Sequence, residues 1–571
     1  MSFLDQLLDP AHRFEQKYAE HLVNRFRGMP FPGARLDLER AWIEPRGLNT
    51  ALACEARLAI VGAAGMGKTT TLAHLALSHA RALLAGNRRA RVPIFFSVRE
   101  LDPSAPLRIP DLPRGLNVSD ALAVQCPRIF FAEVITRGRA LVLIDDLDAL
   151  PSDAVEAWLR DFASARIVVT AESAPANFAE FRLPGFRDGD IDAFARKLEN
   201  ADAFIAALRN VPRPLTANPL TLTLLARVWQ TNEPLPTRRT ELFDAYAHRM
   251  LNDDETAKML EEVALAIQSG RAASNGFLSK AHGFMRAGRN RTAEFAHGLW
   301  QAYFAARAFS RSPELAPLLE FLQDPRWHDT FLFYAGMTDA SALVNALLAR
   351  GDLFSAGRVI AHARAVHADL RESVMQEIIR CAWNGDARAV AVLAEMSDAT
   401  IADEFAAKLK DKDPIVRRRA AEILGQLQMD RGVGYLLPQL RDANANVRDK
   451  VVESLGRSRS DRVIEPLLVA LRGVAHAGQV DTRLRVAAAK ALGEVGSDKA
   501  VPALVVDLQI GEPEVRAAAA ESLRRIASPL MHESLRGILE SGDEQVRQYA
   551  AGILATVDSK ANLAPETGGV T

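Results

Sequence analysis

The residues best suited to chemistry form one glycine-rich run near the start of the chain. The run Gly62-Ala-Ala-Gly-Met-Gly-Lys68-Thr69 fits the pattern G-x-x-x-x-G-K-[ST] without a mismatch. In such a run the glycines permit unusual φ angles, and successive backbone N–H groups can wrap phosphate oxygens. The ammonium group of Lys68 can reach the outer phosphates, and the Thr69 hydroxyl can bind magnesium. These residues predict a nucleoside-triphosphate site. The expected contacts come from Gly62, Ala63, Ala64, Gly65, Met66, Gly67, Lys68, Thr69 and Thr70.

The segments on either side of this run are those that its chemistry needs. Leu58 to Val61 predicts a short buried strand, and Thr69 to Ala85 predicts a helix. Apolar residues recur along the helix at steps of three and four, so one face should pack on a sheet while the N-terminus points at the anion. The alternative is a glycine-rich turn with a surface lysine, which this context disfavours.

A second group of polar residues follows another apolar run. Leu141 to Ile144 predicts a strand buried on both faces, and Asp145-Asp146-Leu147-Asp148 comes directly after it. Carboxylates at the end of such a strand lie beside the phosphate loop, so we expect Asp145 to bind Mg²⁺ and Asp148 to orient the attacking water. An acidic turn after a strand is the alternative. Lys68 and Asp148 are the predicted catalytic residues, and Thr69 and Asp145 the predicted metal ligands.

Strand and helix patterns alternate through the first third of the chain. Further strands are expected at Val92 to Val98 and at Ile167 to Thr170, whose threonine would face the same crevice. The expected fold is a P-loop α/β core with an open parallel sheet. No Asn-Lys-x-Asp guanine signature is present, so the expected ligand is ATP or ADP.

The overall composition limits the choice of partners. The chain has 571 residues, 49% of them hydrophobic and 25% charged, which suggests three or four domains in an ordinary globular protein. Its 70 basic and 71 acidic residues give a net charge of −1, so no global field attracts nucleic acid or an anionic membrane. The three cysteines form no C-x-x-C pair, and no leader or long apolar run is evident, so we expect a cytoplasmic protein without membrane contact.

Several segments together resemble a known family. Residues 62–69, Val92 to Leu101 and Leu141 to Leu150 look like the NACHT branch of the STAND signal-transduction ATPases. Ala217 to Leu225 resembles the helical subdomain whose proline, here Pro219, lies against adenine. Phe295 to Ala306 resembles the winged-helix segment whose histidine, here His297, meets the phosphates in the closed, diphosphate-bound form.

Each of these two residues also has a structural interpretation. Pro219 after Asn218 is a common helix start, and His297 among aromatic residues could be a core histidine. The chain also departs from the family pattern. Ala149 stands where many relatives have Glu, Asp146 replaces a small residue, and Glu172 stands where many have an arginine that counters γ-phosphate charge. These departures predict either slow hydrolysis, which suits a switch, or an arginine supplied from elsewhere.

The C-terminal half contains a repeat. The pattern Val416-Arg-x-x-Ala-Ala-x-x-Leu-Gly425 recurs with arginines at Arg417, Arg448, Arg485, Arg516 and Arg547, at spacings of 31, 37, 31 and 31 residues. This period predicts an all-α solenoid and resembles short HEAT repeats. Pairing of each arginine with a turn acid of a neighbouring repeat is the favoured explanation of the column, and phosphate binding is the alternative.

The boundaries expected from these patterns divide the chain into seven parts. They are an N-terminal helical lead-in (1–45), a NACHT nucleotide-binding domain (46–184), a helical subdomain (185–235), a winged-helix subdomain (236–310), a helical linker or degenerate repeats (311–405), HEAT repeats (406–557) and a disordered tail (558–571).

The resemblance implies an ATP/ADP switch in defence, cell death or regulation. Its solenoid would sense or dock a protein or ligand, and nucleotide exchange would drive homo-oligomer assembly. Because relatives usually carry an effector at the front, a separately encoded effector is expected. Two alternatives stay open: a scaffold with permanently bound nucleotide, and a nucleic-acid-dependent ATPase that uses the arginine column.

Overall fold

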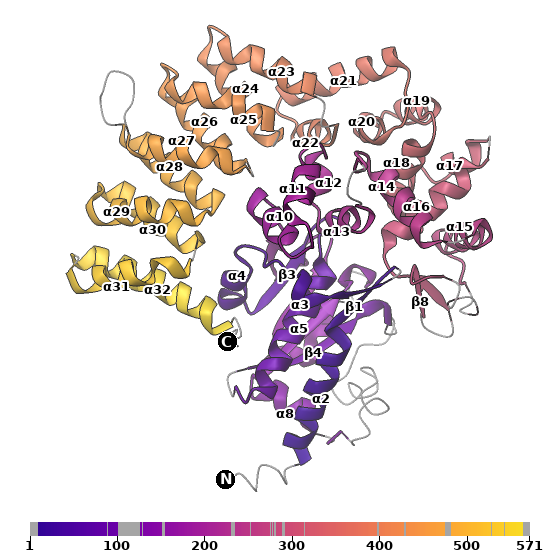
Figure 1. The fold of residues 1–571 in the computed structure, drawn as a ribbon, viewed down its shortest axis with the longest axis horizontal. Coiled ribbons are helices and arrows are strands. Elements are labelled where there is room, and N and C mark those ends of the chain that lie inside the picture. The colour runs from indigo at the N-terminus through magenta and orange to yellow at the C-terminus, as the bar shows by residue number, and fades with distance from the viewer. Residues whose placement is uncertain are drawn as a thin grey trace.

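The computed structural model places the α/β core beneath an arch of helices that the second half of the chain forms (Figure 1). It describes residues 10–563 except 33, 88–89, 101–125, 128, 151–154, 230–233, 252, 274–275, 277, 279–280, 288–291, 313, 397–398, 428–429, 459, 474–480, 527 and 542. The stretch rich in Pro, Asp and Gly at 102–120, which the sequence predicts to be a surface loop, lies outside the described residues. So do residues 474–480, most of the loop insertion (473–480) that the 37-residue spacing of the repeat predicts. Among the helices that it describes, none is both long and apolar enough to cross a bilayer.

The core is a five-stranded sheet in which all the strands run parallel, in the order β4-β5-β6-β3-β7. Its strands are β3 (Arg57–Val61), β4 (Val92–Ser97), β5 (Ala140–Asp145), β6 (Arg166–Ala171) and β7 (Ala179–Arg182), and the helices between them include α5 (Lys68–Leu84), α8 (Phe130–Thr136) and α9 (Val155–Leu159). This confirms the predicted α/β core. The fifth strand, β7, was not predicted because it is a partly exposed edge strand without an apolar run.

The N-terminal segment packs into the same core. It comprises α2 (Pro10–Phe26), the hairpin β1 (Gly28–Phe31) and β2 (Ala34–Asp37), α3 (Leu38–Ala41) and α4 (Leu48–Cys54). The buried face of α2 includes Phe14 and Tyr18, which contact the rings of Phe130 and Phe131 of α8. The hydroxyl of Tyr18 donates to the Pro93 oxygen of β4 at 2.9 Å, so the helix is fixed to the sheet.

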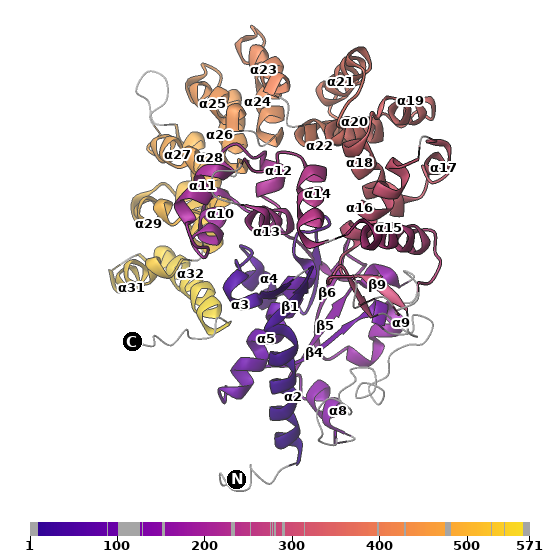
Figure 2. The same cartoon turned by 45° about the vertical axis from the view of Figure 1, so that its right-hand side comes forward.

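The chain then forms two small groups of elements next to the sheet. The first group is α10 (Asp188–Ala195), α11 (Ala201–Leu208), α12 (Arg213–Thr216) and α13 (Pro219–Val228). The second is α14 (Arg239–Met250), α15 (Asp254–Gln268), the antiparallel strands β8 (Met285–Ala287) and β9 (Ala293–Phe295), and α16 (Gly298–Ser310). The rings of Trp300 and Phe243 contact each other in the core of this second group, with their planes tilted by 47°. Figure 2 shows the hairpin β8–β9 beside the sheet.

Stacked helices continue without a break from α16 into the repeats. The intermediate helices are α17 (Ala316–Leu319), α18 (His328–Met337), α19 (Ser341–Ala349), α20 (Leu353–His362), α21 (Ala368–Trp383), α22 (Ala387–Met396) and α23 (Ala399–Ala407). Helix α18 packs on α16, α20 on α18, α22 on α20, and α24 (Pro414–Leu427) on α22. The sequence has apolar-periodic stretches at 327–337 and 341–348, and they lie in this stack largely as α18 and α19.

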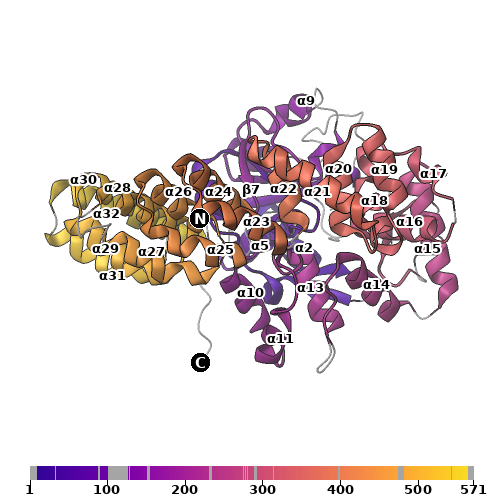
Figure 3. The ribbon, with the colours of Figure 1, turned by 90° about the horizontal axis from the view of Figure 1, so that it is seen from above.

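The HEAT array has two layers of helices, which Figure 3 shows from above. One layer is α24, α26 (Ala445–Arg457), α28 (Thr482–Val495), α30 (Pro513–Ile526) and α32 (Glu544–Leu563), and the other is α25 (Asp430–Leu436), α27 (Ile464–Leu471), α29 (Val501–Ile510) and α31 (His532–Ser541). Helix α32 extends to Leu563 and contacts α4 of the core. The boundary predicted at 558 falls within this helix, and residues 564–571 lie outside the described range.

The repeated Leu-Gly pair allows neighbouring helices of the first layer to approach closely. A Cβ atom on Gly456 would lie 2.8 Å from Cα of Ala491, and one on Gly493 would lie 2.6 Å from Oγ of Ser522. Since real Cβ contacts are longer, glycine is needed at these positions for packing.

Four of the five arginines in the column pair with an acid of the next repeat, as the favoured explanation required, whereas Arg547 pairs with Glu544 of its own helix. Arg417 binds both oxygens of Asp442 at 2.7 and 2.9 Å, and Arg448 binds Asp481 at 2.6 Å. Further along, Arg485 pairs with Glu512 and Arg516 with Asp543. Each of these four pairs joins one repeat to the turn of the next, so these guanidinium groups link the array internally.

Candidate nucleotide-binding site

The loop that carries the predicted anion contacts joins β3 to α5. Gly65 and Gly67 have φ angles of +79° and +89°, a region that residues with a side chain rarely adopt. Gly67 is the N-cap of α5, so the helix begins at Lys68 with its first-turn N–H groups directed toward the loop. The predicted helix start at Thr69 and the observed start at Lys68 differ by one residue.

Lys68 lies across the loop that it follows. Its Nζ donates to the backbone oxygen of Gly62 at 2.5 Å and to that of Ala63 at 3.5 Å. The side chain is half-buried. A cation held on the loop carbonyls in this way lies close to the place where phosphate oxygens would meet the loop amides.

Asp145 joins the end of β5 to the phosphate loop. The residue is only 5% exposed, and its Oδ1 accepts hydrogen bonds from the Thr170 hydroxyl at 2.6 Å and from the Thr69 hydroxyl at 3.1 Å. Burial and the neighbouring Asp146 carboxylate raise the pKa of Asp145 to about 6, whereas the two hydroxyl donors oppose that rise.

The same atoms fit a magnesium ion that arrives with a nucleotide. The Thr69 hydroxyl and the Asp145 carboxylate are adjacent hard oxygen donors, and Mg²⁺ usually takes one or two such protein ligands and completes its shell with phosphate and water. Among the described residues, no group of three or more His, Cys, Asp or Glu is arranged to hold a metal ion.

The two other acids of this run lie in different surroundings. Asp146 has a φ of +58°, and its carboxylate accepts from Ser97 Oγ at 3.3 Å and pairs with Arg99 at 3.2 Å. Both carboxylate oxygens of Asp148 accept from the backbone N–H of Glu172 at 2.9 Å. Burial, the largest effect, raises the pKa of Asp148, and Lys68 acts in the opposite direction.

Distant parts of the chain bring His297 and Pro219 toward the loop. His297 is the N-cap of α16, and its Nδ1 accepts from Leu299 N at 3.1 Å. Burial lowers the pKa of His297 to about 4, and the charges that act on its ring include Lys68 and Asp146. Pro219 is the first residue of α13, and the residue before it contacts the loop directly.

Three residues near the site were not singled out from the sequence. Asn218 donates from Nδ2 to the Ala64 oxygen at 3.1 Å, although an Asn-Pro pair by itself indicates only a helix cap. Arg99 follows the apolar run of β4, and an arginine at the end of a buried strand was an available signal. Arg286 of β8 lowers the pKa of Asp145 electrostatically, and nothing in the sequence of this hairpin marked it.

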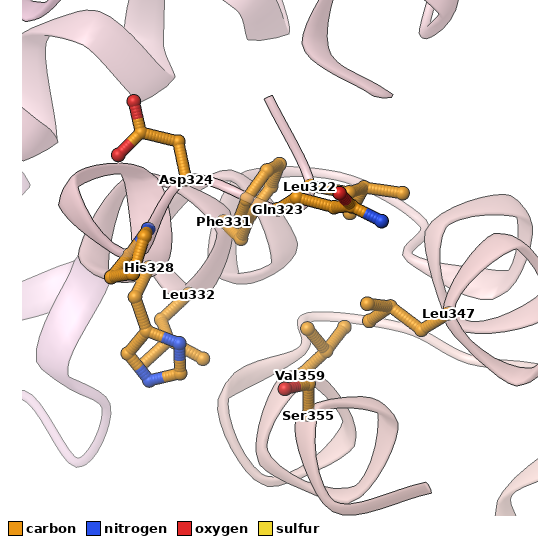
Figure 4. A pocket seen from close by; sticks show the side chains of 10 residues that line it. Leu322, Gln323, Asp324, His328, Phe331, Leu332, Leu347, Ser355 and Val359 are labelled. Carbon is orange, nitrogen blue, oxygen red and sulfur yellow. The ribbon is translucent and has the colours of Figure 1, made fainter. Parts of the chain in front are cut away.

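A cavity of about 200 Å³ lies in the helical stack, away from the phosphate loop (Figure 4). Leu322, Phe331, Leu347 and Val359 line it together with the polar side chain of His328. The ring of His328 also lies 3.1 Å from Arg358, which binds Glu395. This cavity brings none of the predicted site residues together.

Comparison with known proteins agrees with the two halves of this architecture. The NACHT domain family matches residues 56–201, and the HEAT repeat family matches residues 402–477 and 474–556. A search of curated proteins found no significant match.

Several solved structures are similar to parts of the chain. The complex of CpcE and CpcF of phycocyanin lyase from a Nostoc species is 23% identical, covers 28% of this chain and 99% of its own, and has a TM-score of 0.23. An engineered protein is 21% identical over 34% of this chain and 91% of its own, with a TM-score of 0.24. Human deoxyhypusine hydroxylase in complex with glycerol is 16% identical over 38% of this chain and 99% of its own, with a TM-score of 0.15.

The family matches confirm the architecture expected from the sequence. A NACHT domain is a P-loop NTPase domain, which implies nucleotide binding with Mg²⁺, and the phosphate loop, Lys68 and Asp145 all lie within its matched range. The chain thus combines a NACHT domain at residues 56–201 with C-terminal HEAT repeats at residues 402–556.

Proposed function

We propose that the protein is a signalling switch driven by adenine nucleotide. In its resting form ADP and Mg²⁺ occupy the phosphate loop, and exchange for ATP releases the segment of residues 239–310 so that protomers assemble. The HEAT array senses or docks the triggering protein or ligand. A slow ATPase step would return the switch to its resting form. In that step Lys68 would contact the phosphates and Asp148 would orient the attacking water.

One observation carries this proposal: His297 lies within the electrostatic reach of Lys68 and Asp146 although it belongs to a different part of the chain. When a contact forms in one arrangement of the domains and is lost in another, a nucleotide can bind the two arrangements with different affinity. Nucleotide exchange then shifts the population between them. The helix order, hairpin and final helix of residues 239–310 are compatible with the winged-helix interpretation. The roles of Pro219 at adenine and of the switch in defence rest on the family resemblance.

A direct experiment measures phosphate release and molar mass in solution. The purified protein is compared with ADP, with ATP, and as the Asp148→Asn variant with ATP. If the protein is a switch, its molar mass in solution should rise with ATP, because protomers assemble. The Asp148→Asn variant should stay assembled longer because it hydrolyses ATP more slowly. Lys68→Ala should abolish nucleotide retention, so tight ADP retention by that variant would contradict the site.

The scaffold alternative has a specific observation in its favour. Glu172, which stands where many relatives place an arginine, lies beside Asp148 through its backbone N–H and brings a negative charge to that edge. A scaffold would bind ADP, and its molar mass in solution would be the same with ADP and with ATP. The nucleic-acid alternative is weaker because the arginine column is engaged by acids.

A further inference from the structure

The start of α13 is hydrogen-bonded to two backbone carbonyl groups of the phosphate loop. Asn218 donates from Nδ2 to the Ala64 oxygen at 3.1 Å, and Leu220 donates from its backbone N–H to the Gly65 oxygen at 3.2 Å. The contact is close: a Cβ atom on Gly65 would lie 2.9 Å from Oδ1 of Asn218 and 3.0 Å from Cβ of Leu220. The sequence pattern accounts for neither hydrogen bond.

The orientation of the Asn218 amide is set by its second role. Its Oδ1 accepts from the N–H groups of Leu220 at 3.0 Å and Thr221 at 3.3 Å, as an N-cap does. The oxygen is thus committed to α13, and the Nδ2 group is the part that reaches the loop. Asn218 therefore joins two helix starts, since α13 begins at Pro219 and α5 begins directly after the loop.

Because of the geometry of a trans peptide, these two hydrogen bonds also orient backbone N–H groups that could bind an anion. In a planar trans unit the C=O and the following N–H point in opposite directions. When Asn218 draws the Ala64 carbonyl to one side, the N–H of Gly65 is turned to the other. Holding the Gly65 carbonyl on Leu220 does the same for the N–H of Met66, which otherwise makes only a long bond of 3.3 Å to the Ala63 oxygen.

We propose that Asn218 is a positioning residue that presets the amides of the phosphate loop for a polyphosphate chain. It acts through the loop backbone and need not touch the nucleotide itself. Because the amides are oriented before binding, the bound anion does not have to reorganise them, which raises affinity. This inference rests on the proposed nucleotide binding and assigns Asn218 a function separate from any contact of Pro219 with adenine.

The test separates the two ends of the Asn218 side chain. Asn218→Asp keeps an oxygen that can cap α13 but loses the donor to Ala64, and Asn218→Ser keeps a short neutral cap that loses the same donor. Asn444→Asp is the matched control, because Asn444 caps α26 in the HEAT array by accepting from Asn446 N at 2.9 Å. Titration calorimetry would measure binding of ADP and of inorganic tripolyphosphate, which lacks adenine.

We expect both Asn218 variants to weaken ADP and tripolyphosphate by about tenfold, the loss for one or two hydrogen bonds, while thermal stability stays near that of the wild type. The Asn444 control should bind both ligands normally. Unchanged tripolyphosphate affinity in both variants would overturn the inference, as would a loss confined to Asn218→Asp, which would reflect added negative charge alone. If the wild type binds neither ligand, the proposed nucleotide binding itself fails.

Discussion

Arg46 donates from Nη1 to the backbone oxygen of Val495 at 2.6 Å. This bond joins the segment that leads into the core to α28 of the HEAT array, of which Val495 is the last residue. Arg187 donates to the same oxygen, and Arg46 also reaches the Gly496 oxygen at 3.0 Å. The carbonyl end of a helix carries partial negative charge, so two guanidinium groups are well placed there. The HEAT array is thereby fastened to the nucleotide-binding half.

Removing both arginines should loosen this contact without unfolding the protein. A charge contact at a helix terminus contributes about 0.3–1 kcal/mol, so its loss should weaken the attachment of the HEAT array to the core. In the double variant Arg46→Ala and Arg187→Ala, we therefore expect faster hydrogen exchange at residues 492–496 and a larger radius of gyration in X-ray scattering. Arg483→Ala is the control, since Arg483 pairs with Asp449 within the array. Scattering curves that overlay for the double variant and the wild type would contradict the expectation.

The hydroxyl of Thr170 should matter more than its methyl group. It donates to Asp145 at 2.6 Å and accepts from the backbone N–H of Asp146 at 2.9 Å. Thr170→Val leaves that N–H without its acceptor and removes a donor from the carboxylate, so we expect a loss of about 1–3 kcal/mol in the free energy of unfolding and weaker binding of Mg-ATP. Thr170→Ser keeps the hydroxyl and should restore both in denaturation and calorimetry. Equal behaviour of the Val and Ser variants would exclude this role.

The sequence was sufficient for those features that depend on local pattern. The phosphate loop, the apolar strand before Asp145 and the repeated arginines each have a periodicity or spacing that one segment carries by itself. Asn218 and Arg286 could not be assigned because their partners, Ala64 and Asp145, come from other elements. Arg99, which pairs with Asp146, follows a buried strand, and that signal was available in the sequence. The edge strand β7 was missed for a related reason, since it has one sheet neighbour and a partly exposed surface.

The helices of residues 316–407 show the limit of repeat detection. They stack on one another and on α24, but the arginine and Leu-Gly positions that mark the HEAT array are not repeated there. Close packing at glycine also occurs in this earlier stack, because a Cβ atom on Gly357 would overlap with Cδ1 of Ile378. The contact there is not marked by a repeated Leu-Gly pair, and aromatic pairs such as Trp383 with Phe405 also fill the stack.

The role of glycine in the array can be tested by adding one methyl group. Gly456→Ala would place a Cβ 2.8 Å from the Ala491 backbone, so we expect a loss of about 1–3 kcal/mol in the free energy of unfolding. Gly434→Ala is the control, because a Cβ there meets nothing within 4 Å and alanine favours a helix. Chemical denaturation should show opposite signs for the two variants. A neutral Gly456→Ala would mean that the helices can separate at little cost.

His297 provides a pH test of the contact between α16 and the phosphate loop. Burial lowers its pKa from 6.5 to about 4, with Lys68 and Arg239 acting in the same direction and Asp329 and Asp146 against it. Between these pH values the unfolded chain binds the proton more readily than the folded protein does. The stabilising contribution is therefore complete above pH 6.5 and is lost as the pH falls toward 4.

Replacing His297 by Asn isolates this contribution. Asparagine can still accept from Leu299 N–H and cap α16, but it does not titrate. We expect the wild type to lose stability relative to His297→Asn as the pH of urea denaturation falls from 7.5 to about 4.5, without ligand. Other buried histidines, such as His362, are present in both proteins and cancel in the difference. Bound ADP should make the wild-type loss smaller, because a phosphate near the ring favours its protonated form and brings the folded-state pKa closer to 6.5. Parallel stability curves for the two proteins would show that the imidazole is not held neutral beside the loop, and the closed arrangement inferred from it would then have no support.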